Sequence, residues 1–318
     1  MQSQQLVRLA DDGSTPVFTT QDYQTAEQSL DRAASTLSDT RGFAVNSTHI
    51  KQAIKSQNGK MRRAFGGKLS DEQQAALRHV LSDKQLSSVV GLAGAGKSTL
   101  LATAQDAWAK QCVTVHGAAL AGKAAEELQN ASGISSRTLA SLEMSWKNGY
   151  DPIAKGDVLV IDEAGMIGTR QLSRITTKMN EIGAKLVLVG DPDQLQPIEA
   201  GTPFRRVVND HGAARLTEIH RQKVDWQKQA SRDLAAGELT KAVNQYRRRN
   251  AATQVNERGA AIEALVETYA MDAAAHGSTK SRLAFAHKRK DVHALNQAIR
   301  AALRSDGDAP PETLFSTD

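Results

Sequence analysis

The chain has 318 residues, of which 40% are hydrophobic and 24% charged, an ordinary balance for a globular protein. No apolar run reaches the roughly 18 residues that a membrane helix needs, and the first residues lack the apolar core of a secretory signal. Cys112 is the single cysteine, so an internal disulfide is excluded and a reducing, cytoplasmic location is expected. The net charge of +5 is compatible with an anionic partner but does not require one.

The first part of the chain is expected to be helical. Residues 17–56 predict two or three helices, because the apolar residues between Tyr23 and Leu37 recur at helical spacing. The stretch 55–68 that follows is polar, basic and glycine-containing, as linkers are. We therefore predict an N-terminal helical domain over residues 1–67.

From Leu69 the pattern changes to alternating helices and strands. Helices are predicted at 70–82, 97–110, 122–131, 136–146 and 169–183, and strands at 87–93, 112–117, 157–162 and 184–190. Short apolar strands separated by helices predict an α/β domain with a parallel sheet covered on both faces, over residues 68–211. In such sheets, ligands bind at the carboxyl ends of the strands, where the connecting loops converge.

After about residue 212 the pattern becomes mostly helical. One strand-like piece at 282–287 leads into a predicted helix at 291–303, and the last residues carry neither signal. We interpret residues 212–318 as a second domain that begins and then breaks off.

A glycine loop joins the strand at 87–93 to the next helix. Its sequence is Gly91-x-x-x-x-Gly96-Lys97-Ser98, the P-loop pattern, placed between a strand and a helix as the pattern requires. Backbone amides from Gly94 to Thr99, including those of Ala95 and Gly96, would surround the phosphates of ATP. Lys97 would reach the β- and γ-phosphates, and the Ser98 hydroxyl would bind Mg²⁺. The alternative is a glycine-rich turn that only connects the two elements.

Two further strands end in polar residues. "VLVIDEAGM" brings Asp162, a candidate Mg²⁺ ligand, and Glu163, a candidate base for the attacking water; the alternative for Asp162 is a helix N-cap. "LVLVGDPDQLQP" ends in Gln194, whose amide can bond the γ-phosphate while ATP is intact and so report the nucleotide state. The alternative for this loop is an Asp-Pro turn with a solvated glutamine.

These motifs, in the order "GLAGAGKST", "VLVIDEAGMIG", "VGDPDQLQPIEAG" and "LTEIHRQ", resemble those of RecD-like superfamily-one DNA helicases. Within that class, "GAALAGKAAEEL" and "SRTLASLE" look most like the helicase region of TraA-type conjugative relaxases. The resemblance covers about residues 15–304. It implies a RecA-like first lobe, the start of a second RecA-like lobe, Mg-ATP hydrolysis and 5′→3′ movement on single-stranded DNA during plasmid transfer, with other conjugation proteins as partners.

The resemblance also implies two residue roles. Gln73 of "LSDEQQAA" corresponds to the residue that holds the adenine base, although Ser70 and Gln73 also form the S-x-x-Q pattern of a capping box. Arg221 of "EIHRQ" corresponds to an arginine finger that reaches the γ-phosphate. The alternative for Arg221 is an ordinary surface arginine.

The segment after the second predicted strand resembles the family's contact with single-stranded DNA. Leu120-Ala121 stands where family members commonly carry Pro-Thr, so a phosphate contact there would use backbone amides or Lys123. Trp146 and Trp226 are candidates for stacking on bases, with core packing as the alternative. The basic stretches 245–250 and 287–293 fit a phosphate-contacting surface or solvated helix ends equally well.

The sequence departs from TraA-type relaxases in two respects. Its eight histidines form no clustered H-x-H metal signature, so no nicking activity is expected. The family's last two motifs do not occur, so we expect a fragment of a longer helicase. Two other functions stay open: a non-catalytic DNA-binding or scaffolding module, and, less in keeping with "GDPDQLQP", a P-loop phosphotransferase for small molecules.

Overall fold

The computed structural model describes residues 6–11, 16–92, 94–194, 197, 201–218, 224–277 and 281–305. The chain forms two compact units, Met1–Lys228 and Gln229–Asp318. Among the described helices, none combines the length and the apolar character needed to cross a bilayer.

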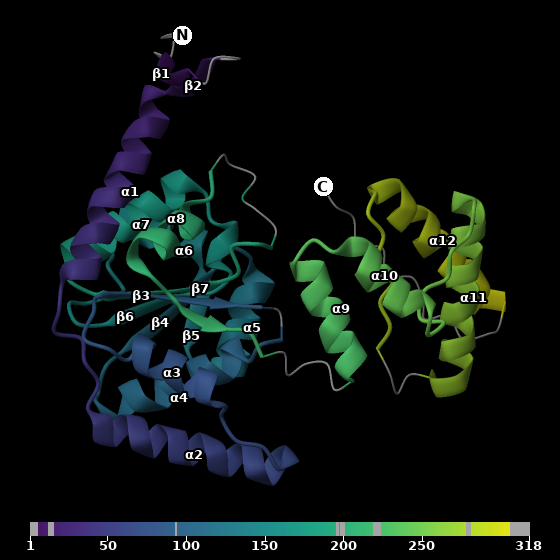
Figure 1. The fold of residues 1–318 in the computed structure, drawn as a ribbon, viewed down its shortest axis with the longest axis horizontal. Helices are drawn as coiled ribbons and strands as arrows, with labels where there is room; N and C mark the ends of the chain where they lie inside the picture. Colours follow the sequence, from purple (N-terminus) through teal and green to yellow (C-terminus); the bar gives the residue numbers. More distant parts are fainter. Residues whose placement is uncertain are drawn as a thin grey trace. The chain divides into compact units, whose positions relative to one another are not determined.

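The first unit is built on a sheet of six parallel strands (Figure 1). In spatial order these are β5 (Ser135–Thr138), β4 (Val115–Ala119), β6 (Val158–Ile161), β7 (Lys185–Gly190), β3 (Leu86–Gly91) and β8 (Ala214–Leu216). The strands that precede the three motif loops, β6, β7 and β3, are direct neighbours. This confirms the prediction that the loops leave one sheet at the same edge.

Helices cover both faces of this sheet, as predicted (Figure 1). One face carries α1 (Gln21–Asp39), α6 (Leu139–Lys147), α7 (Thr169–Ile182) and α8 (Pro203–His211); the other carries α2 (Ser47–Phe65), α3 (Asp71–Val80), α4 (Lys97–Lys110) and α5 (Gly122–Ser132). Successive residues of β7 alternate between the two cores: Leu186 and Leu188 pack on the first, Val187 and Val189 on the second. This is the α/β architecture that the alternating pattern predicts, and it is RecA-like, as the resemblance implies.

The N-terminal helices belong to these two cores. Leu30 and Leu37 of α1 are buried in one core, and Ala53 of α2 is buried in the other. The stretch 55–68 continues α2 to Phe65, where Gly66 ends the helix in the left-handed conformation. The contacts thus divide the chain near Lys228, whereas the sequence predicts divisions after residues 67 and 211. A short antiparallel hairpin, β1 (Leu6–Asp11) and β2 (Pro16–Thr20), precedes α1.

Two short edge strands do not follow from the local sequence. Residues 136–138 are predicted as helix but lie in β5, which pairs with β4 before α6 begins. Strand β8 has three residues and pairs with β3. Both strands depend on hydrogen bonds to a distant neighbour, and such pairing overrides a weak local preference.

The second unit consists mainly of helices. They are α10 (Leu239–Arg247), α11 (Arg258–His276) and α12 (Arg289–Ser305), while α9 (Asp225–Ala235) spans the division between the units. Residues 282–287, predicted as a strand, pair with no strand in the described part of the chain, so they form none. Their assignment to a second RecA-like lobe remains a prediction.

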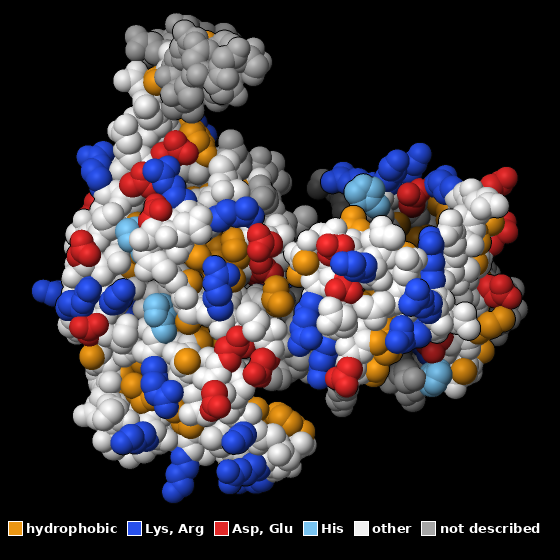
Figure 2. Space-filling view, in the orientation of Figure 1, with side chains coloured by type: hydrophobic (Ala, Val, Ile, Leu, Met, Phe, Trp, Pro, Cys, Tyr) orange, Lys and Arg blue, Asp and Glu red, His pale blue; other side chains and the backbone are white. Residues whose placement is uncertain are grey.

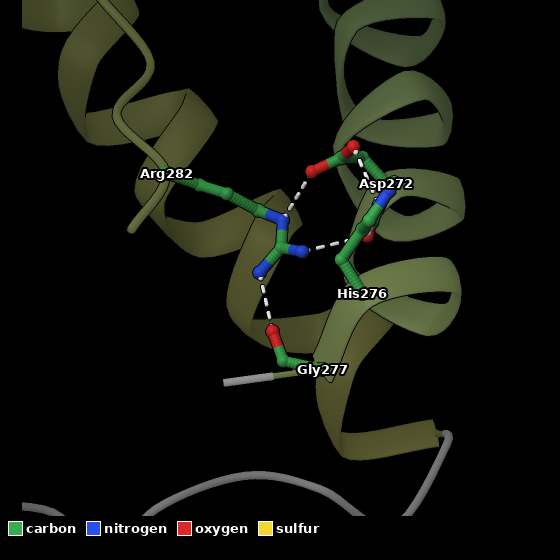
Figure 3. A network of polar contacts seen from close by, with 4 residues as sticks. All are labelled: Asp272, His276, Gly277 and Arg282. Atoms are coloured by element: carbon green, nitrogen blue, oxygen red, sulfur yellow. Dashed lines mark hydrogen bonds and ion pairs between the residues drawn. The ribbon is translucent and has the colours of Figure 1, made fainter. Parts of the chain in front are cut away.

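A polar network fixes this segment to α11 (Figure 3). Arg282 donates from Nε to Asp272 Oδ2 at 2.6 Å and from a terminal nitrogen to the Gly277 carbonyl at 2.8 Å. His276 lies 3.1 Å from the other Asp272 carboxylate oxygen. After Arg282, exposed and half-buried residues alternate, and Leu283 and Phe285 are 75% and 81% exposed.

The amino-terminal edge of the sheet holds a buried cation. Lys185, the first residue of β7, is fully buried, and its Nζ donates to the carbonyls of Ser82 and Lys84. The neighbouring Gln85 amide donates to the Ala184 carbonyl at 2.9 Å. Burial lowers the pKa of Lys185 to about 7, and nearby Asp83 opposes this shift.

Replacing Lys185 by Met should change how stability depends on pH. The folded protein, with a pKa of about 7 at Lys185, binds fewer protons than the unfolded chain between pH 7 and about 10. The free energy of unfolding of the wild type should therefore rise with pH in this range. Its slope should exceed that of Lys185→Met by on the order of 1.4 kcal/mol per pH unit. Urea unfolding at pH 7 and 9 measures this. Parallel pH profiles for the two proteins would contradict it, and Lys178→Met, at a partly exposed lysine paired with Asp151, is the control.

Candidate nucleotide site

The loop between β3 and α4 has the backbone of a phosphate cradle. Gly94 and Gly96 have φ angles of 80° and 84°, which glycine adopts without steric cost. Lys97 folds back so that its Nζ donates to the Gly91 carbonyl at 3.1 Å. A Cβ on Gly91 would lie 2.9 Å from Lys97 Cγ, so glycine at 91 makes room for the lysine. Ala93 lies outside the described residues.

The first turn of α4 offers backbone donors at the same place. The first amides of an α-helix have no intrahelical acceptor, and the N-cap residue Gly96 provides no side-chain acceptor for them. Ser98 is exposed there and Thr99 is half-buried, whereas Ala95 is buried beneath the loop. Free amides at a helix N-terminus, next to a lysine, form an anion site of the kind that holds phosphates.

The strand end after β6 adds two carboxylates. Asp162 Oδ1 accepts from the Glu163 amide at 2.9 Å, and Glu163 has a φ of 53°, a conformation that few non-glycine residues adopt. Lys97 Nζ lies 3.9 Å from Glu163 Oε1. Burial raises the pKa of both carboxyl groups, and the positive charge of Lys97 partly offsets each shift. A carboxylate with a raised pKa is a better proton acceptor, as a general base requires.

The loop after β7 contains a carboxylate that holds Gln194. Asp191 is buried; it accepts the Asp193 amide on Oδ1 and the Gln194 side-chain amide on Oδ2, each at 3.0 Å. The carboxylate therefore builds the turn and orients Gln194. It also lies near enough to Glu163 to raise the pKa of that residue. The sequence predicts the glutamine, and the structure adds the residue that positions it.

The loops after β6 and β7 touch backbone to backbone. A Cβ on Gly165 would lie 2.5 Å from the Asp191 carbonyl oxygen, and one on Gly190 would lie 2.9 Å from the amide nitrogens of Ala164 and Gly165. Neither contact leaves space for a side chain. Glycine at both positions therefore allows the carboxylate pair and the glutamine loop to share one site.

Residues from the outer helices support the loop after β7. Arg205 of α8 donates from one terminal nitrogen to the Pro192 carbonyl at 2.8 Å and to Asp193 Oδ1 at 3.0 Å. Further along, the hydroxyls of Tyr23 in α1 and Thr169 in α7 lie 2.8 Å apart. A Cβ on Gly201 would lie 2.3 Å from the Tyr23 hydroxyl. Sequence reasoning missed these residues, because nothing local links α1 or α8 to this loop.

Helix α3 brings Gln73 and Glu72 to the same edge of the sheet. Gln73 is buried and completes the capping box. Its side-chain Oε1 accepts the backbone amide of Ser70 at 3.1 Å, and its backbone amide donates to Ser70 Oγ at 3.2 Å. The adenine contact implied by the resemblance thus remains a proposal. Glu72 accepts the amides of Thr217 and Glu218 at 2.9 and 3.0 Å and so holds the chain where β8 ends. Arg221 lies outside the described residues.

The other candidates lie away from this cluster. Lys123 is exposed on α5, and the N-cap of that helix, Ala121, makes no side-chain cap, which leaves amides free there. Trp146 packs against the core formed with α1, α6, α7 and α8, as the packing alternative predicts, and Trp226 is half-buried. Within the described ranges, no group of three or more His, Cys, Asp or Glu side chains is arranged to hold a metal ion.

A family model for the AAA domain matches residues 68–257, and the chain belongs to this family. The chain is 40% identical over 291 residues to the conjugal transfer protein TraA of Rhizobium radiobacter, covering 92% of this chain and 25% of that protein. It is 30% identical over 155 residues to the ATP-dependent RecD2 DNA helicase of Deinococcus radiodurans, covering 48% of this chain and 22% of that protein. Among solved structures, the Pif1 helicase of Candida albicans aligns with a TM-score of 0.45 and 20% identity, over 68% of this chain and 56% of that one.

The chain is thus a helicase-like P-loop domain of the AAA family, related to TraA proteins and RecD-like helicases, as the motifs predict. It spans about a quarter of the length of the TraA protein of Rhizobium radiobacter.

Substituting alanine at Gly165 should destabilise the first unit. The new Cβ would meet the backbone oxygen of Asp191 at 2.5 Å, so the two loops must separate, at a cost of about 1–3 kcal/mol in the free energy of unfolding. Gly122→Ala is the matched control, because a Cβ there meets nothing within 4 Å. Urea unfolding curves compare the two variants. Equal stabilities would show that the loops do not depend on this close approach.

Proposed function

We propose that this chain is the ATP-driven part of a DNA motor, which hydrolyses Mg-ATP in the P-loop site and moves along single-stranded DNA. One observation carries the proposal. Three neighbouring strands deliver a phosphate loop, a carboxylate pair and a glutamine loop to one sheet edge, with Lys97 Nζ 3.9 Å from Glu163 Oε1. Phosphoryl transfer needs this combination of positioning and charge.

The residues present suit ATP and Mg²⁺. The uncapped amides of α4 and Lys97 would neutralise the phosphate oxygens. Ser98 and Asp162 supply the hard oxygen ligands that Mg²⁺ prefers, and the metal would offset the charge of the phosphates. Glu163 would accept a proton from the attacking water, which suits its raised pKa.

Gln194 and Arg221 would link the nucleotide to motion. In the structure Gln194 is bonded to Asp191 at 3.0 Å, so binding a γ-phosphate would exchange that acceptor for another. Such an exchange makes the loop sensitive to hydrolysis. Arg221 would supply a further positive charge to the phosphate. Gln73 would contact the adenine through its side-chain NH₂ group, since the capping box uses the Oε1 atom.

The DNA contact would begin at the N-terminus of α5. The uncapped amides after Ala121 and the exposed Lys123 can bond phosphates of a single strand. Support for a role in conjugative transfer comes from the TraA relatives, which are named as conjugal transfer proteins. The 5′→3′ direction and further conjugation partners rest on the resemblance to the RecD-like class.

Replacing Lys97 by Ala should abolish ATP hydrolysis. The lysine Nζ lies 3.9 Å from Glu163 Oε1, and the transferred phosphoryl group needs its positive charge. Steady-state phosphate release with and without oligo-dT measures the effect, and the wild type should be faster with DNA. Lys110→Ala, at the exposed end of the same helix, is the matched control. Wild-type binding of oligo-dT without any turnover would instead support a non-catalytic DNA-binding module.

Replacing Glu163 by Gln should preserve ATP binding and reduce turnover by about 10²–10⁴-fold, because the amide cannot accept the proton of the attacking water. Equilibrium binding of a fluorescent ATP analogue and single-turnover hydrolysis separate the two effects. A variant that hydrolyses ATP at the wild-type rate would exclude Glu163 as the base.

A further inference from the structure

Helix α2 carries a charge pattern that the nucleotide site does not use. Between Ser47 and Phe65 it contains five Lys and Arg residues and no Asp or Glu. Its apolar side is fixed, since Ala53 is fully buried in the core shared with α3 and α4. Figure 2 shows Lys and Arg side chains gathered along this helix, at the bottom of the first unit.

Part of this charge lines a groove between α2 and α3, with a volume of about 450 Å³. Lys51, Lys55 and Arg62 of α2 and Arg78 of α3 lie along it together with polar amide side chains, and no carboxylate lines it. All four cations are exposed, and within the described residues none of them forms an ion pair. Like charges gathered without counter-charges repel one another, so an anion bound in the groove would relieve that repulsion.

The spacing of the cations suits a polymer. From Lys51 to Arg62 the helix rises about 16 Å, which matches about five stacked nucleotides at about 3.4 Å each. A single phosphate would contact only one end of such a row. Asn58, which lies in the middle, already uses its Oδ1 to accept the Leu69 amide at 2.8 Å, so this oxygen adds no free acceptor to the groove.

An aromatic side chain stands at the end of the row. Phe65, the last residue of α2, is 71% exposed, close in sequence to Arg62 and Arg63. A Cβ on Gly67 would lie 2.6 Å from the Phe65 ring, so the chain beyond α2 packs directly on the ring. An exposed, supported ring beside cations is a platform on which an unpaired base can stack.

We propose that the α2–α3 groove binds single-stranded nucleic acid, with its phosphates on Lys51, Lys55, Arg62 and Arg78 and a base on Phe65. This deepens the proposed function and rests on it, since it gives the motor a second contact with its strand, outside the loops at the carboxyl edge of the sheet. The exposed ring selects a single strand, because bases in a duplex are already stacked.

The test is binding of fluorescein-labelled oligo-dT to the full chain, measured by anisotropy without nucleotide at several salt concentrations. The triple variant Lys51→Ala/Lys55→Ala/Arg62→Ala should bind at least ten-fold more weakly, and its salt slope should fall by about 2, since each single-strand phosphate contact contributes about 0.7. Alanine favours helix, so α2 should persist, as circular dichroism would verify. Phe65→Leu should weaken oligo-dT binding several-fold and leave binding to a blunt duplex unchanged.

The control removes equal charge elsewhere in the same unit: Lys110→Ala/Lys147→Ala/Lys155→Ala, all at exposed positions. Equal losses in the two triple variants would overturn the proposal, because they would reflect net charge alone. Unchanged oligo-dT binding combined with lost binding to phosphatidylserine vesicles would also overturn it, in favour of a lipid surface. The binding measurement needs no hydrolysis, so a failed ATPase test would leave its result unchanged. Likewise, a failed binding test would leave the ATPase result unchanged.

Discussion

The structure depends on the close approach of two backbones, at Gly165 and Gly190 in the loops after β6 and β7. Because neither position has room for a Cβ, Gly165 lies against the carbonyl of Asp191, and Gly190 lies against the amides of Ala164 and Gly165. Strand β7 also adjoins β3, whose loop carries Lys97. The contact therefore brings the glutamine loop to the carboxylates on one side and to the phosphate loop on the other. The loops after β3, β6 and β7 are each an ordinary turn on their own, and their approach to one another forms the candidate nucleotide site.

The electrostatics of this cluster are unbalanced. Lys97 lies near Asp162 and Glu163, Asp191 adds a third carboxylate near Glu163, and burial raises the pKa of Asp162 and Glu163. Partly buried carboxylates that outnumber the cations beside them are costly for the fold, and such clusters are typical of functional sites. A divalent metal ion would remove the imbalance by supplying positive charge between the carboxylates and the phosphates. This charge balance agrees with the Mg-ATP that we propose as the ligand of the site.

The opposite edge of the sheet is held by different means. There Lys185 and Gln85 satisfy the carbonyls of the loops that enter β3 and β7, in buried surroundings. The amino-terminal edge of the sheet is therefore closed by buried hydrogen bonds, while the opposite edge is built from glycine turns and from side-chain contacts such as that of Gln194 with Asp191. The outer face of α2 is a third region, whose groove-lining cations are exposed and form no ion pair with any residue that the structure describes.

The sequence by itself determined the parallel sheet with helices on both faces, the strand-to-helix context of Lys97 and the positions of Asp162, Glu163 and Gln194 at strand ends. These depend on local periodicity and on glycine turns, which a short window contains. Only the tertiary structure decided that Asp191 orients Gln194, that Glu72 holds the chain after β8, that Arg205 and Tyr23 support the glutamine loop, and that α1 and α2 pack on the same sheet. It also decided that β5 and β8 are strands and that residues 282–287 are not. Each of these depends on a partner distant in the sequence, and such contacts leave no periodic signal in the segment itself.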